Sequence, residues 1–99
     1  MTILKIDLQE GFAADTVVIR VNDREVFRKD QVTTRTQIGY ADSLQVDVKP
    51  STANVEVNLP SKNLSEKIEV PVFATVYLGV SIDKGRIVYQ ISDQMFGYL

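Results

Sequence analysis

The feature that most constrains this chain is a period-two pattern. Short stretches with every second residue apolar are interrupted about every eight to twelve residues by Gly, Pro, Asn, Asp or Ser. Successive side chains of a β-strand point to opposite faces, so the pattern gathers the apolar residues of each stretch on one face. Nowhere do apolar residues recur at the three- and four-residue spacing of an amphipathic helix over a dozen positions. The pattern therefore predicts an all-β protein, a two-layer antiparallel β-sandwich of about seven to nine short strands.

The 99 residues are predicted to form a single domain, 1–99, because a chain of this length buries roughly two thirds of the surface that its unfolded form exposes. With 44% hydrophobic and 24% charged residues, the composition is that of an ordinary globular protein. About seven strands in this length resemble an immunoglobulin-like or transthyretin-like sandwich in architecture. The chain has no cysteine pair and no tryptophan, so the resemblance concerns architecture alone and implies no function.

Residues 2–8 show the alternation most clearly. The row of side chains expected in the core is Leu4, Ile6 and Leu8. The row expected to face water is Ile3, Lys5 and Asp7. Further strands are predicted at residues 16–21, 25–29, 32–36, 44–48, 53–59, 73–82 and 86–92, with another beginning at residue 68. The segment 32–36 has few apolar residues, so we expect it at a sheet edge. Pro71 cannot donate to a strand ladder, so we expect it either to bend its strand or to restrict that strand to an edge.

The Asn-Asp dipeptide at 22–23 tolerates the positive φ angles of a two-residue hairpin turn. With this turn, Ile19 lies opposite Val26 in the core, and Arg20 lies opposite Glu25 on the solvent side. An apolar pair inside and opposite charges outside both favour this register.

Histidine, cysteine and tryptophan are absent from the sequence. Acid–base or nucleophilic catalysis would depend on Asp, Glu, Lys, Tyr or Ser, and with thirteen Asp and Glu residues chance pairs of carboxylates are common. Their positions on the polar sides of the predicted strands fit a solvated sheet face. We therefore expect no enzymatic activity and no cofactor, and a hydrolase that uses a carboxylate pair is the least favoured alternative.

Eleven basic residues against thirteen acidic residues give a net charge of −2, which removes the long-range attraction to phosphate backbones. No window approaches the run of about eighteen apolar residues that a membrane-spanning helix needs. The first residues alternate instead of forming the apolar run of a signal peptide, and no disulfide framework suggests secretion. We expect a cytoplasmic protein that binds neither nucleic acid nor membranes.

A calcium-dependent binding module is one alternative, because calcium accepts carboxylate and amide oxygens without nitrogen or sulfur ligands. If the strands simply run up and down, the loops that carry Asn22, Asp23 and Asp42 share one end of the sandwich. Turn chemistry alone also explains these three residues, and no calcium-loop spacing accompanies them. They are weak metal candidates.

Carbohydrate binding is the other ligand alternative, and it needs exposed aromatic rings. The chain offers four tyrosines: Tyr40, Tyr77, Tyr89 and Tyr98. Tyr89 is in phase with Ile87 and Ile91 and is predicted in the core, whereas Tyr77 is predicted on the outer face.

Apolar residues are in excess where strands should meet water and in the C-terminal tail. They are Ile3, Val18, Phe27 and Val88, followed by Met95, Phe96, Tyr98 and Leu99. A two-layer sandwich has one buried layer, so its outer faces are covered by the tail or by a second protein, although single exposed apolar residues are also normal. We predict an interaction or structural module that binds protein and self-associates as a homo-oligomer. The expected contact residues are Val18, Phe27, Phe96, Tyr98 and Leu99.

Overall fold

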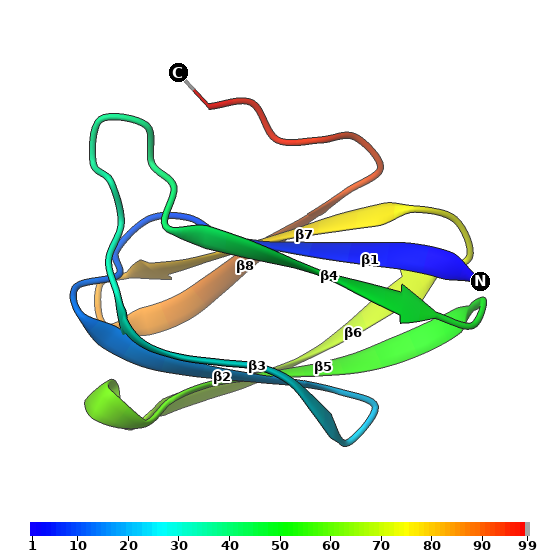
Figure 1. The fold of residues 1–99 in the computed structure, drawn as a ribbon, viewed down its shortest axis with the longest axis horizontal. Helices are drawn as coiled ribbons and strands as arrows, with labels where there is room; N and C mark the ends of the chain where they lie inside the picture. The colour runs from blue at the N-terminus through cyan, green and yellow to red at the C-terminus, as the bar shows by residue number, and fades with distance from the viewer. Residues whose placement is uncertain (99) are drawn as a thin grey trace.

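The structure, a computed structural model that describes residues 1–98, is a sandwich of two four-stranded sheets packed face to face (Figure 1). Its strands are β1 (Thr2–Leu8), β2 (Asp15–Val21), β3 (Arg24–Val32), β4 (Asp42–Val48), β5 (Ser51–Leu59), β6 (Leu64–Val72), β7 (Val76–Asp83) and β8 (Arg86–Ser92). A short 3-10 helix, η1 (Pro60–Lys62), connects β5 to β6. The prediction of an all-β, two-layer sandwich is confirmed.

The first sheet has the order β4-β1-β7-β8, and the second has the order β3-β2-β5-β6. Strands β1 and β7 run parallel, and the other neighbouring strands run antiparallel. In an immunoglobulin constant-type domain the first two strands are neighbours in one sheet. Here β1 and β2 lie in different sheets, so the strand order differs from the immunoglobulin one.

The core lies between the sheets and consists of the apolar rows that point inward from each strand. Leu4, Ile6 and Leu8 are fully buried, as the alternation predicted. The second sheet contributes the matching row from β2 and β5, including Ile19, Val55 and Val57, which are also buried. Because each row is a period-two set, the strand faces follow directly from the sequence.

The β2–β3 hairpin has the predicted two-residue turn, with φ angles of 51° at Asn22 and 67° at Asp23. Arg20 lies opposite Glu25, as expected, but a register shift follows and Ile19 lies opposite Phe27 instead of Val26. A bulge of one residue moves every later side chain to the other face. The prediction that Phe27 points outward is therefore wrong: it shares the face of Ile19 and packs, half-buried, against the core.

The predicted strand at 32–36 is not formed. Val32 ends β3, and the following residues make a loop that is closed by an isolated bridge between Arg35 and Tyr40. The Thr34 hydroxyl donates to the Gln9 carbonyl and accepts from the Phe12 amide. These side-chain bonds satisfy backbone groups of the neighbouring loop, which explains a β-branched polar residue outside a strand.

Candidate functional site

The three weak calcium candidates do not meet. Asn22 and Asp23 form the β2–β3 turn, whereas Asp42 begins β4 and contacts Lys29, well along β3 from that turn. The end of β4 that lies beside the turn is the other end, near Val48. The expectation of a shared end is therefore wrong, because the strands do not run simply up and down within one sheet. Among residues 1–98, no three acidic side chains gather closely enough to hold a metal ion.

Asp42 has a structural role where the edge strands β3 and β4 of the two sheets face each other. Its Oδ2 accepts a hydrogen bond of 2.6 Å from the Lys29 Nζ, and its Oδ1 accepts one from the Ser43 amide. Burial by itself raises the pKa of Asp42, but these two bonds outweigh it and hold the pKa below the ordinary value. Since Asp42 and Lys29 belong to different sheets, the ion pair links the edges of the two layers.

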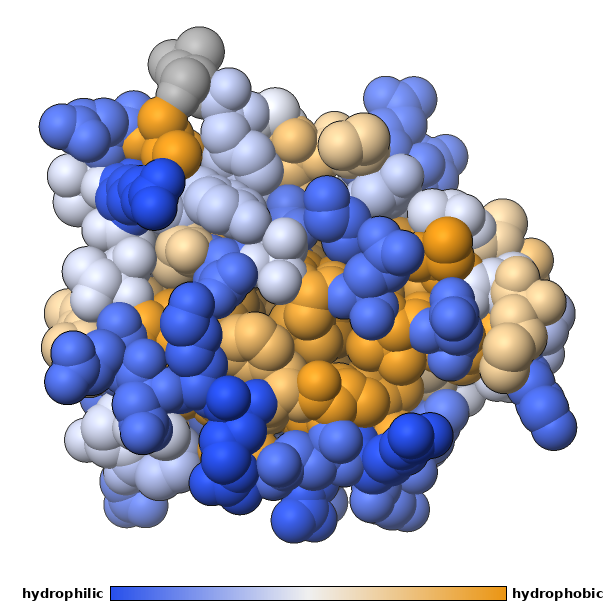
Figure 2. Space-filling view, in the orientation of Figure 1, coloured by the Kyte–Doolittle hydropathy of each residue, from blue (hydrophilic) through white to orange (hydrophobic). Residues whose placement is uncertain are grey.

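Beyond this ion pair, a groove of about 820 Å³ separates the edge strands β3 and β4. Its apolar lining includes Val26 and Val46, both half-buried against the core. Figure 2 shows apolar surface in the middle of this face, flanked by polar side chains. The polar lining mixes signs, with Arg24 and Glu25 on β3 and Asp47 on β4, so the groove has no single-sign attraction for a charged ligand.

Strand β8 forms the far edge of the first sheet and is unusually apolar for an exposed edge. Val88, Tyr89 and Ile91 are 39%, 49% and 41% exposed. Tyr89 and Ile91 lie opposite the buried Val80 and Leu78, so they belong to the inward row. The prediction that Tyr89 lies in the core is wrong, because its side chain stays exposed. Both residues are only partly covered, since within residues 1–98 no strand of this sheet lies beyond β8. Sequence reasoning missed this surface, since alternation indicates a face but not a position in the sheet.

The predicted contact residues are spread over both sheets. Val18, expected to face water, is 6% exposed, and Phe27 packs against the core. Phe96 and Tyr98 are half-buried in the tail, over the first sheet. Leu99 lies outside the described residues. The structure therefore does not gather this predicted set into one patch.

The tail contributes a polar cluster on the outer face of the first sheet. The Tyr98 hydroxyl donates to the Asp7 Oδ2 at 2.8 Å and accepts from the Gln9 Nε2 at 3.0 Å. The ring centroids of Tyr98 and Tyr40 are 4.9 Å apart. Burial, together with the carboxylate of Asp7, raises the pKa of Tyr98 to about 12. Asp7 was expected to face water; it does point outward, but it is only 4% exposed.

Asp7 has a second unusual property. Its Oδ1 is buried, and among residues 1–98 it has no hydrogen-bond partner. Buried polar atoms are almost always paired, so this carboxylate retains an acceptor that Tyr98 does not use.

Comparisons of the chain with protein-family models, with curated proteins and with solved structures gave no significant match. Within residues 1–98, no helix combines the length and the apolar character that crossing a bilayer requires.

Proposed function

We propose that the protein is a cytoplasmic interaction module that self-associates by pairing β8 with β8 of a second copy. The observation that carries this proposal is the clustering of exposed apolar side chains on one edge strand. Among the residues that the structure describes, six large apolar side chains are exposed, and three of them, Val88, Tyr89 and Ile91, belong to β8. An edge strand also presents unpaired backbone N–H and C=O groups, which a second strand satisfies.

The sequence of β8 is compatible with antiparallel pairing about a two-fold axis. With the axis at Tyr89, Ile87 lies opposite Ile91 of the second copy, and Arg86 lies opposite Ser92. The inward row then becomes a continuous apolar stripe across the interface, and no like charges face each other. Both the backbone groups and the exposed apolar area are covered by the same contact.

The other three edges are less suited to self-pairing. Strand β3 carries five charged residues: Arg24, Glu25, Arg28, Lys29 and Asp30. Strand β6 carries Lys67, Glu69 and Pro71, and proline lacks the amide donor. Strand β4 carries Asp42 and Asp47 beside the groove. Charged residues and proline are the features by which natural edge strands avoid pairing, and β8 has few of them.

Sedimentation equilibrium tests the proposal by measuring the mass of the protein over a range of concentrations. The wild-type protein is expected to form a dimer. Ile91→Lys should raise the dissociation constant at least about tenfold, because the interface would then bury a lysine against an apolar side chain. Ile91 is already 41% exposed, so the monomer tolerates this change.

Phe73→Lys is the matched control. Phe73 is 65% exposed but belongs to the connection between β6 and β7, not to β8. This variant should dimerise like the wild type. A wild-type protein that stays monomeric at every concentration, or a Phe73→Lys variant that dissociates as strongly as Ile91→Lys, would contradict the proposal.

A further inference from the structure

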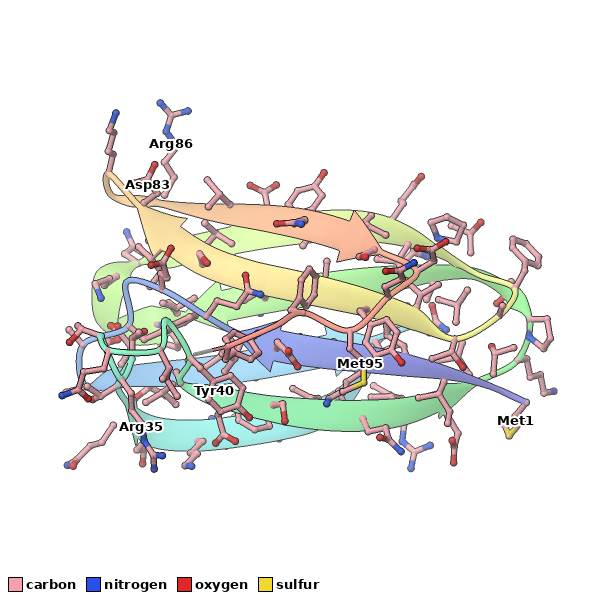
Figure 3. All side chains as sticks on the ribbon, turned by 90° about the horizontal axis from the view of Figure 1, so that it is seen from above. Met1, Arg35, Tyr40, Asp83, Arg86 and Met95 are labelled. Atoms are coloured by element: carbon pink, nitrogen blue, oxygen red, sulfur yellow. The ribbon has the colours of Figure 1, made fainter. Side chains whose placement is uncertain are left out.

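The last described residues of the chain lie across the outer face of the first sheet. Figure 3 views this face from above and shows the segment after β8 passing over β7 and β1 toward Tyr40, which belongs to the β3–β4 loop. Tyr98 is hydrogen-bonded to Asp7, 91 positions earlier in the chain. The contact therefore joins the two ends of the sequence through side chains.

In this segment, residues 93–98, Phe96 is half-buried, and a single side chain, that of Tyr98, makes hydrogen bonds to the sheet. Apart from the two hydrogen bonds of the Tyr98 hydroxyl, the described residues show no hydrogen bond between 95–98 and the sheet. Met95 is 67% exposed and Gly97 is exposed. The segment is thus not an additional strand, and its hydrogen bonds to the sheet depend on the phenol group of Tyr98.

The residues that receive Tyr98, namely Asp7, Gln9 and Tyr40, belong to other elements of the fold, and we call them the socket. Asp7 and Gln9 are fixed by β1 and its continuation, and the Tyr40 position is fixed by its bridge to Arg35. The strand neighbours of Asp7 are Ser43 and Gly79, which are both small, so space remains above the carboxylate for a ring. A Cβ on Gly79 would approach the Gln9 amide to 2.6 Å, so glycine there also leaves room for the Gln9 side chain.

The socket is not fully used by Tyr98. One carboxylate oxygen of Asp7 accepts a hydrogen bond from the phenol, while the other is buried without a donor among residues 1–98. A buried acceptor without a partner is costly, so a segment that brought a second donor to this oxygen would gain a hydrogen bond that residues 93–98 do not make.

We propose that Asp7, Gln9 and Tyr40 form a recognition site for a tyrosine-containing segment of a partner protein. In the free protein this site is occupied by the chain's own residues 93–98. The partner segment displaces the tail by placing its phenol on Asp7 and its ring beside Tyr40. The tail is then an autoinhibitory occupant, and its release accompanies binding. This site lies on the outer face of the sheet and does not depend on the β8 contact proposed above.

The test uses the full chain and a fluorescently labelled peptide with the sequence of residues 93–98, followed by anisotropy. In the Tyr98→Ala variant the socket is vacant, so the peptide should bind at least about tenfold more tightly than it binds the wild type, where the tail competes. A peptide in which phenylalanine replaces the tyrosine should bind Tyr98→Ala about tenfold more weakly, because it lacks the hydrogen bond to Asp7.

Phe73→Ala is the matched control, since it removes an exposed aromatic side chain that belongs neither to the socket nor to β8. It should bind the peptide as weakly as the wild type does. Circular dichroism confirms that each variant is folded; if Tyr98→Ala is not, Tyr98→Phe replaces it, with the same expected order of affinities. Equal affinities of the wild type and the vacated variant, absence of peptide binding to the vacated variant, or equal binding of the phenylalanine peptide would overturn the proposal.

Discussion

Two buried aspartates on the strands of this protein are satisfied to different degrees. Asp15 is 2% exposed and accepts hydrogen bonds from the Ala13 amide, the Ser61 hydroxyl and the Lys62 Nζ. Asp7 is 4% exposed, but within residues 1–98 one of its oxygens has no donor. The fully paired carboxylate of Asp15 stabilises the fold, because it attaches η1 to β2, whereas the partly paired carboxylate of Asp7 is the one to which we assign a binding role.

Asp15 should make unfolding dependent on pH. Burial by itself raises its pKa, but the hydrogen bonds from Ala13, Lys62 and Ser61 outweigh this effect and hold the pKa below the usual 3.8. The unfolded chain then binds the proton more tightly than the folded protein does. The stabilisation is therefore present above pH 3.8 and is lost as the pH falls through the lower pKa of the folded state.

Asp15→Asn should lower the free energy of unfolding near neutral pH by about 1–3 kcal/mol, because Lys62 loses its ionic partner. It should also reduce the fall in stability at acidic pH. Urea denaturation from about pH 7 to about pH 3 measures both effects. Asp23→Asn, at an exposed turn position that asparagine also tolerates, should leave both unchanged. An Asp15→Asn variant with the stability and acid dependence of the wild type would refute this assignment.

At the scale of the elements, the connection between β1 and β2 packs closely on β7. The backbone N–H of Gln9 donates to the Val80 carbonyl, and the backbone N–H of Ile82 donates to the Glu10 carbonyl. Gly11 follows with a φ of +88°, and a Cβ there would lie 2.1 Å from the Ile82 carbonyl oxygen. Glycine is required both for the backbone conformation and for this close approach.

Gly11→Ala should therefore destabilise the protein more than Gly85→Ala does. Gly85 has a φ of +76° in the β7–β8 turn, but a Cβ there meets nothing within 4 Å. Conformational strain alone costs about 1–2 kcal/mol at Gly85, and the displaced β7 backbone adds to that cost at Gly11. Urea denaturation of the two variants gives the comparison, and equal losses of stability would show that the close approach relaxes at no cost.

Comparison of the predicted with the observed strands and turns shows which elements depend on local sequence alone. The strand at 2–8 and the turn at 22–23 match the structure because each depends on neighbouring residues. The segment 32–36 does not, because Thr34 bonds to a loop more than twenty residues away in sequence. The bulge near Val26 also escaped prediction, since one extra residue leaves the local composition unchanged while it reverses the face of Phe27.

At the scale of the whole molecule, the proposed self-association through β8 would make the stability of the fold depend on protein concentration. A partner that binds only the folded state stabilises it by mass action. The melting temperature of the wild type should therefore rise with protein concentration, whereas that of Ile91→Lys should not. Calorimetry at several concentrations makes this comparison. A wild-type melting temperature independent of concentration would count against the dimer.

The sequence by itself determined that this protein is all β and which side chains of the regular strands point inward, because alternation with period two is a local property of an extended chain. The bulge that reverses the face of Phe27 is the exception. Only the tertiary structure decided that β8 is an edge and that Tyr98 covers Asp7. Strand order and covering contacts join residues far apart in sequence, and their free energies depend on the packing of the assembled sheets. The alternation within one segment therefore does not predict strand order or covering contacts.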